Sequence, residues 1–490
     1  MAKPTPLSGF PELLPAQRYV EQHVQDSLRR TFELHGFSSL ETRAVEPMDQ
    51  LLRKGETSKE VYVLRRLQDE GEGTDTGMGL HFDLTVPFAR YVLENAGKLE
   101  FPFRRYQIQR AWRGERPQEG RFREFTQADI DVVMRDELPF HFDVEVARVM
   151  AEALSALPLP PMRLRVNNRK LIEGFYRGIG APDPAAVITI VDKLDKLPAA
   201  EVARLLVEDG GLDDAQAKQC LALAEIESTD LSFVELVRDL GVSDELLDTG
   251  LEELAAVMEG CASVNTDRFQ VVASLSLARG LDYYTGTVFE IYMDGFENLK
   301  SVGGGGRYDA LASDGRTTYP GVGISFGISR TVVPLVQRGL LTADRSVPSV
   351  VLVALADEAA RESANGVAQR LRARGIAAEV AASPQRFGKQ IRYAERRGVP
   401  YVWFPGADGA ADQVKDIRSG DQVDADPDAW TPPTDDLRPR VVSLREASSL
   451  GTSGQATSTT EGTDRSAVSS PRWTRGTTVR EMPNEMPTPG

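Results

Sequence analysis

The segment Phe103–Val133 holds the densest group of side chains that could bind a charged, aromatic ligand. Two strand-like arms flank a polar loop, Gly114–Gly120. Because successive side chains of a strand point to opposite faces, the second arm should present one mixed polar and aromatic face: Arg121, Arg123, Phe125, Gln127, Asp129 and Asp131. The opposite face should point into the core: Phe122, Ala128, Ile130 and Val132. An aromatic ring can stack on a flat base, guanidinium groups can bind phosphate, and an amide with carboxylates can hold an amine. We interpret the mixed face as a ligand floor; an exposed, charge-rich hairpin is the alternative.

A second polar pair lies in HFDLTVPFAR, residues His81–Arg90. Interpreted as a strand, this segment aligns Asp83 with Thr85 and points Phe82, Leu84 and Val86 into the core. A carboxylate and a hydroxyl can together hold an ammonium group by charge-assisted hydrogen bonds. An edge strand with outward polar residues would show the same pattern.

A single arginine, Arg279, precedes Asp282, Tyr283 and Tyr284 in SLARGLDYYTGTVFEIY. A buried arginine needs an anion or a carboxylate as its partner. The partner could be an anionic ligand, in which case Arg279 would do chemistry. It could also be Asp282, in which case the pair would be structural.

Two glycine-rich segments follow. SVGGGGRYDAL, Ser301–Leu311, has four consecutive glycines, which are entropically unfavourable unless the backbone takes positive φ or approaches a ligand closely. It lacks the GK[ST] and GxGxxG patterns of nucleotide loops, and a flexible linker is the alternative. GVGISFGISR, Gly321–Arg330, predicts a strand that leads into a helix over Thr331–Leu340. Arg330 would stand at the helix start, where the dipole disfavours a cation unless an anionic ligand binds there.

The elements that position these residues follow from hydrophobic spacing. Apolar residues four apart predict a helix over Leu14–His35, and a strand-like run, Phe37–Val45, follows and is closed by Pro47. The stretch Pro184–Cys261 has helical spacing throughout, and strand patterns resume at Phe269. The helical stretch therefore looks like an insertion into a sheet-containing domain.

The C-terminal region predicts a separate small domain. Short strand-like and helix-like segments alternate there: Val350–Leu355, Glu358–Arg374, Ala377–Val380, Lys389–Arg397 and Tyr401–Phe404. This alternation is typical of an α/β domain with a largely parallel sheet. Four cations recur at helical spacings, which suggests an RNA-binding face or merely a solvated one: Lys389, Arg392, Arg396 and Arg397. Beyond about Ala447, Ser, Thr, Gly and Pro dominate, so we expect a disordered tail.

Composition excludes several classes. The net charge of −16 argues against indiscriminate nucleic-acid coating but not against a shaped RNA held on local basic patches. Two cysteines, Cys220 and Cys261, cannot form a disulfide framework and are expected to be reduced core thiols. The four histidines lack metal-ligand spacing, so no zinc is expected. Without a signal pattern or a membrane-length apolar run, we expect a soluble, cytoplasmic protein.

From about Leu7 to Leu444, these segments in this order resemble the histidyl-tRNA synthetases, a class II aminoacyl-tRNA synthetase family. The helix and strand that end at Pro47 are similar to motif 1, which forms the dimer interface in that family. Phe103–Val133 is similar to motif 2, Gly321–Arg330 to motif 3, and RGLDYY to a histidine-specific signature. QVKDIRSGDQ and the segment around Lys389–Arg397 resemble the family's anticodon-binding domain.

The resemblance implies an α+β fold: a catalytic domain with an antiparallel sheet and flanking helices, a helical insertion, and a C-terminal α/β anticodon-binding domain. The implied boundaries are 1–183 and 263–341 for the two parts of the catalytic domain, 184–262 for the insertion, 342–348 for a linker, 349–446 for the anticodon-binding domain and 447–490 for the tail.

The resemblance also implies roles for individual residues. Those toward ATP are Arg113 on the α-phosphate, Arg121 and Arg330 on the terminal phosphates, Glu115 on the adenine edge and Phe125 stacked on the base. Those toward histidine are Asp83, Thr85 and Gln127 on the ammonium group, and Asp131 and Tyr284 on the imidazole with Tyr283 nearby. Arg279 would be the catalytic cation. The family more often has Glu at positions 83 and 131, where the shorter Asp draws the carboxylate back.

The implied reaction joins L-histidine to tRNA(His) through histidyl-adenylate, with ATP and Mg²⁺, in a homodimer without zinc, an organic cofactor or a membrane. One rival is a catalytically silent paralogue that regulates histidine biosynthesis; that class typically lacks the anticodon-binding domain and the catalytic residues. An RNA-binding sensor module on the same fold is another. ATP–pyrophosphate exchange with histidine would separate the three.

Overall fold

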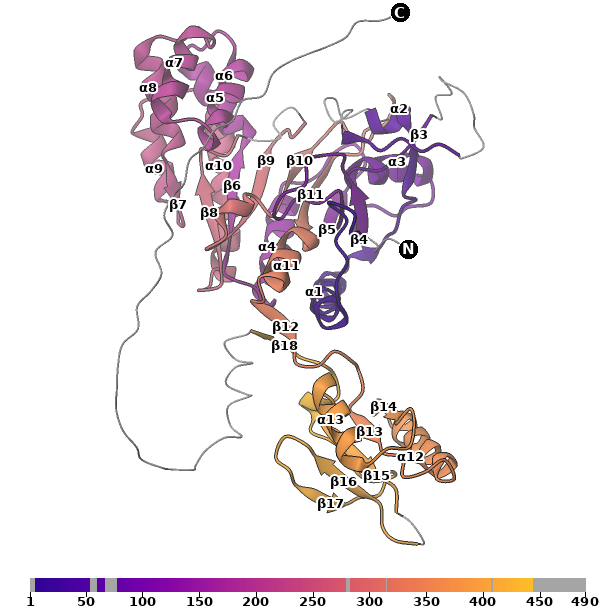
Figure 1. The fold of residues 1–490 in the computed structure, drawn as a ribbon. Helices are drawn as coiled ribbons and strands as arrows, with labels where there is room; N and C mark the ends of the chain where they lie inside the picture. Colours follow the sequence, from indigo (N-terminus) through magenta and orange to yellow (C-terminus); the bar gives the residue numbers. More distant parts are fainter. Residues whose placement is uncertain are drawn as a thin grey trace, which may run out of the picture. The chain divides into compact units, whose positions relative to one another are not determined.

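The computed structural model describes residues 5–52, 60–66, 77–278, 283–313, 315–406 and 409–443. Within these ranges the largest sheet has nine strands in the order β1-β4-β5-β11-β10-β9-β6-β8-β7 (Figure 1). Neighbouring strands are antiparallel except β1 with β4 and β6 with β8. A predominantly antiparallel sheet with flanking helices agrees with the expected class II architecture.

Most strands of this sheet come from the two segments that precede and follow the helical insertion in the sequence. Their bounds are β1 Ser38–Ser39, β4 Phe103–Trp112, β5 Glu124–Val133, β6 Met162–Asn168, β7 Glu227–Ser228, β8 Phe269–Ser274, β9 Thr287–Met293, β10 Gly303–Tyr308 and β11 Gly321–Gly327. The pairing of β5 with β11 joins the motif 2 hairpin to motif 3, although the insertion separates them in the chain. A smaller antiparallel pair consists of β2 (Val45–Pro47) and β3 (Met78–Leu80).

The first helix agrees with its predicted periodicity. Helix α1 (Pro15–Leu34) begins on a proline, which is favoured at the first helical position. Four apolar side chains at a spacing of four are completely buried: Val20, Val24, Leu28 and Phe32. They pack in one core with α4 (His141–Ser155) and α11 (Ile328–Gln337). The run Phe37–Val45 is mostly not a strand, because only Ser38–Ser39 and Val45–Pro47 pair with neighbours. The short helix α2 (Met48–Leu51) follows.

The predicted strand over His81–Arg90 is wrong. Helix α3 (Thr85–Asn95) occupies most of this segment. Its first turn is stabilised by the carboxylate of Asp83, which accepts a hydrogen bond from the backbone N–H of Val86 at 3.1 Å. A carboxylate that satisfies a free N–H of the first turn is a helix-initiating signal, and it outweighs the short apolar alternation.

The insertion is almost wholly helical. Its helices are α6 (Pro184–Val191), α7 (Ala199–Glu208), α8 (Asp214–Ala224), α9 (Ser232–Arg238) and α10 (Glu245–Cys261), preceded by α5 (Arg169–Gly178). Aspartates begin three of them by accepting backbone N–H groups: Asp183, Asp213 and Asp244. The prediction of helix throughout misses β7, which pairs with β8 at the sheet edge. Both cysteines are free and buried, as expected.

The C-terminal region forms its own core around a five-stranded sheet, in the order β14-β13-β15-β16-β17 within the described residues. The bounds are β13 Val351–Val353, α12 Arg361–Ala373, β14 Ala378–Val380, α13 Phe387–Arg397, β15 Tyr401–Phe404, β16 Gln413–Asp416 and β17 Gln422–Asp424. The first three strands in chain order are parallel and the last two antiparallel, so the largely parallel prediction covers only part of the sheet.

Two features concern the borders of this region. Strand β12 (Leu341–Ala343) pairs with β18 (Val441–Ser443), so the predicted linker at 342–348 begins inside a strand. The expected tail, 447–490, lies outside the described residues. No helix in the described part of the chain is long and apolar enough to cross a membrane.

Candidate active site

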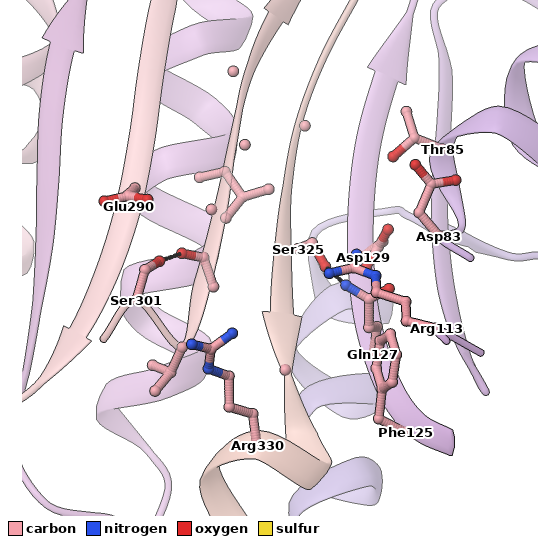
Figure 2. A pocket seen from close by; sticks show the side chains of 18 of the residues that line it. Asp83, Thr85, Arg113, Phe125, Gln127, Asp129, Glu290, Ser301, Ser325 and Arg330 are labelled. Carbon is pink, nitrogen blue, oxygen red and sulfur yellow. Dashed lines mark hydrogen bonds between the residues drawn. The ribbon is translucent and has the colours of Figure 1, made fainter. Parts of the chain in front are cut away.

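A cavity of about 310 Å³ lies on the central sheet, at the lower end of the size range of small-molecule sites (Figure 2). Strands β5, β9, β10 and β11 contribute to its lining. Most of the residues singled out in the catalytic region line it: Asp83, Thr85, Arg113, Glu115, Arg121, Phe125, Gln127, Asp131, Tyr283, Tyr284 and Arg330. Arg279 and Asp282 lie outside the described residues. The fold thus gathers into one site residues as far apart in the sequence as Asp83 and Arg330.

The predicted faces of the second arm are wrong at Phe122 and Arg123, whereas Arg121 lines the cavity as predicted. Strand β5 begins at Glu124, and the turn before it contains Gly120 with φ 71°, so alternation does not extend back into the loop. Phe122 therefore lines the cavity instead of the core. Arg123 is not among the lining residues, and its Nε donates to the backbone carbonyl of Glu115 at 3.3 Å. From Phe125 onward the alternation holds.

One end of the cavity is basic. Arg113 is fixed by a hydrogen bond from its Nε to the carbonyl of Phe82 at 3.0 Å, and its guanidinium carbon lies 5.1 Å from the Phe125 ring centroid. Arg121 is paired with Glu115 at 3.3 Å. Arg330, third residue of α11, donates to the carbonyl of Leu299. Burial first, and then the charge of Arg121, lower the pKa of Arg330 to about 10. Clustered cations at a helix N-terminus favour an anion such as phosphate.

The other end is acidic. Arg105 is completely buried and approaches Asp131 at 2.7 Å and Asp129 at 4.0 Å. Its guanidinium carbon also lies 4.3 Å from the ring centroid of Phe88. Burial raises the pKa of Asp129 to about 7, opposed by Arg105 and reinforced by Asp131. Carboxylates that outnumber the buried cation make this end suitable for a cationic ligand group.

Tyrosines form the wall at the acidic end. The ring of Tyr283 stacks on Tyr308 with centroids 5.8 Å apart, and Tyr308 donates to Oδ1 of Asp131 at 2.7 Å. Burial raises the pKa of Tyr283 and of Tyr284, so both stay protonated at neutral pH. Neutral hydroxyls of this kind can donate to, or accept from, a polar ring.

Several site residues were missed from the sequence. They are Arg105, Glu290, Ser301, Tyr308 and Ser325; all but Arg105 line the cavity. Arg105 was detectable, because pairing of β4 with β5 sets it opposite Asp131. Tyr308 and Ser325 come from strands whose partners are distant in sequence, and no local signal marks them.

The four glycines of β10 allow close approach without positive φ. They lie in extended backbone between β9 and β11. A Cβ at Gly305 would stand 2.0 Å from the carbonyl oxygen of Gly323, and one at Gly306 would stand 2.5 Å from that of Thr287. The glycines are therefore required by the neighbouring strands, and the flexible-linker alternative is wrong.

Gly305→Ala should accordingly destabilise the protein by roughly 1–3 kcal/mol, as expected for overpacking against rigid backbone. The matched control is Gly366→Ala in α12, where an added Cβ would meet nothing within 4 Å. That change should stabilise the helix by about 0.5–1 kcal/mol. Thermal unfolding of the full chain measures both. Equal melting temperatures for the two variants would contradict the packing at β10.

Comparison with known proteins places this geometry in a family. The family model of histidyl-tRNA synthetase matches residues 9–331, and that of the anticodon binding domain matches residues 349–428. The histidine–tRNA ligase of Cutibacterium acnes is 56% identical over 90% of this chain and 99% of its own length. That of Micrococcus luteus is 56% identical over 91% of this chain and 100% of its own length.

A solved structure agrees with the fold. The histidyl-tRNA synthetase of a Nostoc species superposes with a TM-score of 0.76 at 31% identity, covering 92% of this chain and 99% of that one. A Bacillus halodurans protein described as an ATP phosphoribosyltransferase regulatory subunit/histidyl-tRNA synthetase has a TM-score of 0.65 but only 19% identity, so it speaks for the fold alone. From the matched models and the two bacterial relatives together, the chain belongs to the histidyl-tRNA synthetase family.

Proposed function

We propose that this chain is a histidine–tRNA ligase: it activates L-histidine with ATP to histidyl-adenylate and pyrophosphate, then transfers histidine to the 3′ end of tRNA(His). The observation that carries the proposal is the division of charge in one cavity. Arg330 lies within electrostatic reach of Arg113 and Arg121, and Asp129 within reach of Asp83 and Asp131, as a triphosphate and an amino acid with an ammonium group and an imidazole would require. Relatives at 56% identity are named histidine–tRNA ligase.

ATP would bind at the basic end. Arg113 would contact the α-phosphate, while Arg121 and Arg330 would hold the terminal phosphates. Glu115 would bind the adenine edge, and Phe125 would stack on the base. Burial, and after it the charge of Arg121, lower the pKa of Arg330, and the phosphates would offset both by stabilising its charged form. Mg²⁺ would enter as the counter-ion of ATP; the carboxylate of Glu290, which lies near Arg330, is a hard oxygen ligand that suits it.

Histidine would bind at the acidic end. Asp83, Thr85 and Gln127 would hold its ammonium group. Within the described residues, Oε1 of Gln127 is buried and accepts no hydrogen bond, so it offers a ready acceptor. Asp131 and Tyr284 would bind the imidazole, with Tyr283 nearby. The shorter Asp131 is held in place by Arg105 and Tyr308, which fix where its carboxylate ends.

The first reaction joins two anions. The histidine carboxylate attacks the α-phosphorus, the bond from that phosphorus to the bridging oxygen breaks, and pyrophosphate leaves. The carboxylate is already ionised, so this step requires no general base. Arg113 neutralises charge that concentrates on the α-phosphate in the transition state. Arg279, outside the described residues, is proposed as the second catalytic cation. Bound Mg²⁺ would add charge neutralisation on the phosphates.

In the second reaction the terminal-adenosine hydroxyl of tRNA attacks the carbonyl carbon of the adenylate, the bond from that carbon to the phosphate oxygen breaks, and AMP and the hydroxyl proton leave. Helix α13 is the proposed RNA contact. Lys389, Arg392 and Arg396 line one groove with Tyr393, and no ion pair joins these three cations to a carboxylate within the described residues. Arg397 was predicted to belong to the same basic face, but its guanidinium is paired with the carboxylate of Glu379 at 2.6 Å. Its part in RNA binding is proposed to be secondary.

We propose a homodimer through the motif 1 region, α1 to β2, and a cytoplasmic location, in keeping with two free, buried thiols. The three working parts would be the catalytic domain (1–183 with 263–341), the insertion (184–262) and the anticodon-binding domain (349–446), joined by the linker at 342–348, with the tail at 447–490 outside the chemistry. No zinc or organic cofactor enters the proposed reaction.

Histidine-dependent exchange of labelled pyrophosphate into ATP tests the function. The purified chain should catalyse it with L-histidine and not with other amino acids, because a site that bonds both imidazole nitrogens leaves its own groups unpaired with analogues. A regulatory paralogue of histidine biosynthesis, or an RNA-binding module, would give no exchange, and that result would overturn the proposal. The retained Arg113 and Arg330 and the matched anticodon-binding domain favour the ligase over both rivals.

A further inference from the structure

One hydrogen bond and the strand register bring three polar side chains together beside the proposed ammonium site. Nε2 of Gln127 on β5 donates to Oγ of Ser325 on β11 at 2.8 Å (Figure 2). The register of β5 with β11 sets Ser325 opposite Asp129. Asp129 is only 3% exposed. Three polar side chains from two paired strands therefore lie together, with Asp129 buried and Gln127 and Ser325 partly buried at the cavity wall.

The available protons decide which of these side chains donates each hydrogen bond and which accepts it. Ionised Asp129 can only accept hydrogen bonds, whereas a serine hydroxyl has one proton and two lone pairs. Among the described residues, Oδ1 of Asp129 is buried and has no hydrogen-bond partner, so it can accept the proton of Ser325, which lies opposite it in the strand pair and lowers the pKa of Asp129. With its proton directed to Asp129, Oγ of Ser325 can only accept from Gln127. The amide nitrogen of Gln127 then faces Ser325, and its carbonyl oxygen is left for the cavity.

We propose that Ser325 and Asp129 are positioning residues that fix the side-chain amide of Gln127 with its carbonyl oxygen toward the substrate ammonium group. The proposal rests on the proposed function, since it names how that site recognises its amino acid. The two ends of an amide are nearly identical in shape, so packing alone cannot choose between them. A reversed amide would present N–H donors to an ammonium group, which also only donates.

The orientation of the Gln127 amide should respond to pH. Burial raises the pKa of Asp129 to about 7. The charged or titratable groups that face it are Arg105 on β4, Asp131 on β5, Asp83 before α3 and Tyr284. Below that pH a protonated Asp129 can donate to Ser325, whose own proton can then turn to Gln127 and reverse the amide. Histidine affinity should therefore fall as pH decreases through about 7, in addition to any effect of the substrate's own imidazole.

Pyrophosphate exchange with the full chain tests whether Ser325 and Asp129 position Gln127, through the variants Ser325→Ala and Asp129→Asn. Each should raise the KM for histidine by roughly 10- to 100-fold, the value of one hydrogen bond to a charged group, and leave the KM for ATP nearly unchanged. The control is Ser155→Ala, which removes a hydroxyl of α4 that bonds the carbonyl of Ala151. It should change neither constant.

Two inhibitors separate positioning from general loosening. Histidinol keeps the ammonium group and imidazolepropionate lacks it. Ser325→Ala should weaken inhibition by histidinol and leave inhibition by imidazolepropionate as in the wild type. The difference in histidine affinity between wild type and Asp129→Asn should be smaller at pH 6 than at pH 8. Over this interval Asp129 of the wild type takes up a proton, whereas the variant has no carboxylate to protonate.

Three results would overturn the proposal: an unchanged KM for histidine in both variants, an equal loss for ATP and histidine, or an equal loss for the two inhibitors. If Ser325→Ala fails to fold, as judged by its melting temperature, the isosteric Asp129→Asn decides alone. Failure of the proposed function is distinct, because the wild-type chain would then show no histidine-dependent exchange at all.

Discussion

Arg113→Ala should lower the rate of histidine-dependent pyrophosphate exchange by about 10²–10³-fold, with little change in fold, because a preorganised charge is removed from the transition state. The guanidinium is held in advance by its bond to the carbonyl of Phe82 and by the ring of Phe125. Its loss should therefore appear mainly in kcat. Arg113→Lys should recover only part of the rate, since lysine keeps the charge without the planar fork.

Arg110→Ala is the matched control for Arg113. It lies in β4, three residues before Arg113, but its side chain is 65% exposed and paired with Glu124 at the surface. An exposed pair of this kind contributes about 0–1 kcal/mol, so exchange should stay close to wild type. Exchange by Arg113→Ala at a rate within tenfold of wild type would refute its assignment to the α-phosphate.

Substituting alanine for Lys389, Arg392 and Arg396 together should separate the two reactions. Pyrophosphate exchange should remain, because all proposed ATP and histidine ligands lie in the catalytic region. Aminoacylation at low tRNA concentration should fall by roughly one to two orders of magnitude. Each lost phosphate contact should also reduce the slope of log K against log salt by about 0.7–0.9, so the triple variant should lose about two to three units of slope.

The control for α13 is a triple variant of three cations of the same region that are already paired with carboxylates. Arg361 pairs with Glu358, and the others are Arg370 with Asp428 and Arg440 with Asp344. Their charges are locally neutralised, so the salt slope should change little. If the α13 variant charges tRNA as well as this control across a salt series, α13 does not bind RNA.

The sequence predicted best those elements whose cause is local. Four apolar residues at a spacing of four were enough to place α1, and alternation from Phe125 to Asp131 was enough to orient β5. Alternation failed where a local hydrogen bond competed with it. Asp83 bonds the N–H of Val86 and starts α3, a choice that depends on side-chain geometry and not on the pattern of polarity.

The site was predictable only in part, for a different reason. The segment around Gln127 could be recognised from its composition, because it combines charged, amide and aromatic side chains. Ser325, Tyr308 and Arg105 are ordinary residues in their own segments and gain a role only from the strand beside them. Strand pairing between segments that lie far apart in the chain is set by the whole fold, so periodicity within one segment cannot reveal such partners.

The position of β11 beside β5 also determines when the site can exist during synthesis. Strand β5 ends at Val133, whereas β11 begins at Gly321, and the helical insertion is made in between. A ribosome therefore releases the motif 2 hairpin with one edge open, and the insertion can form its local helical contacts before that edge is covered. Pairings of such sequence separation form late, after the costly closure of a long loop. A nascent chain can consequently hold neither substrate until motif 3 has emerged, and the uncovered edge of β5 is where a stalled or truncated chain would aggregate.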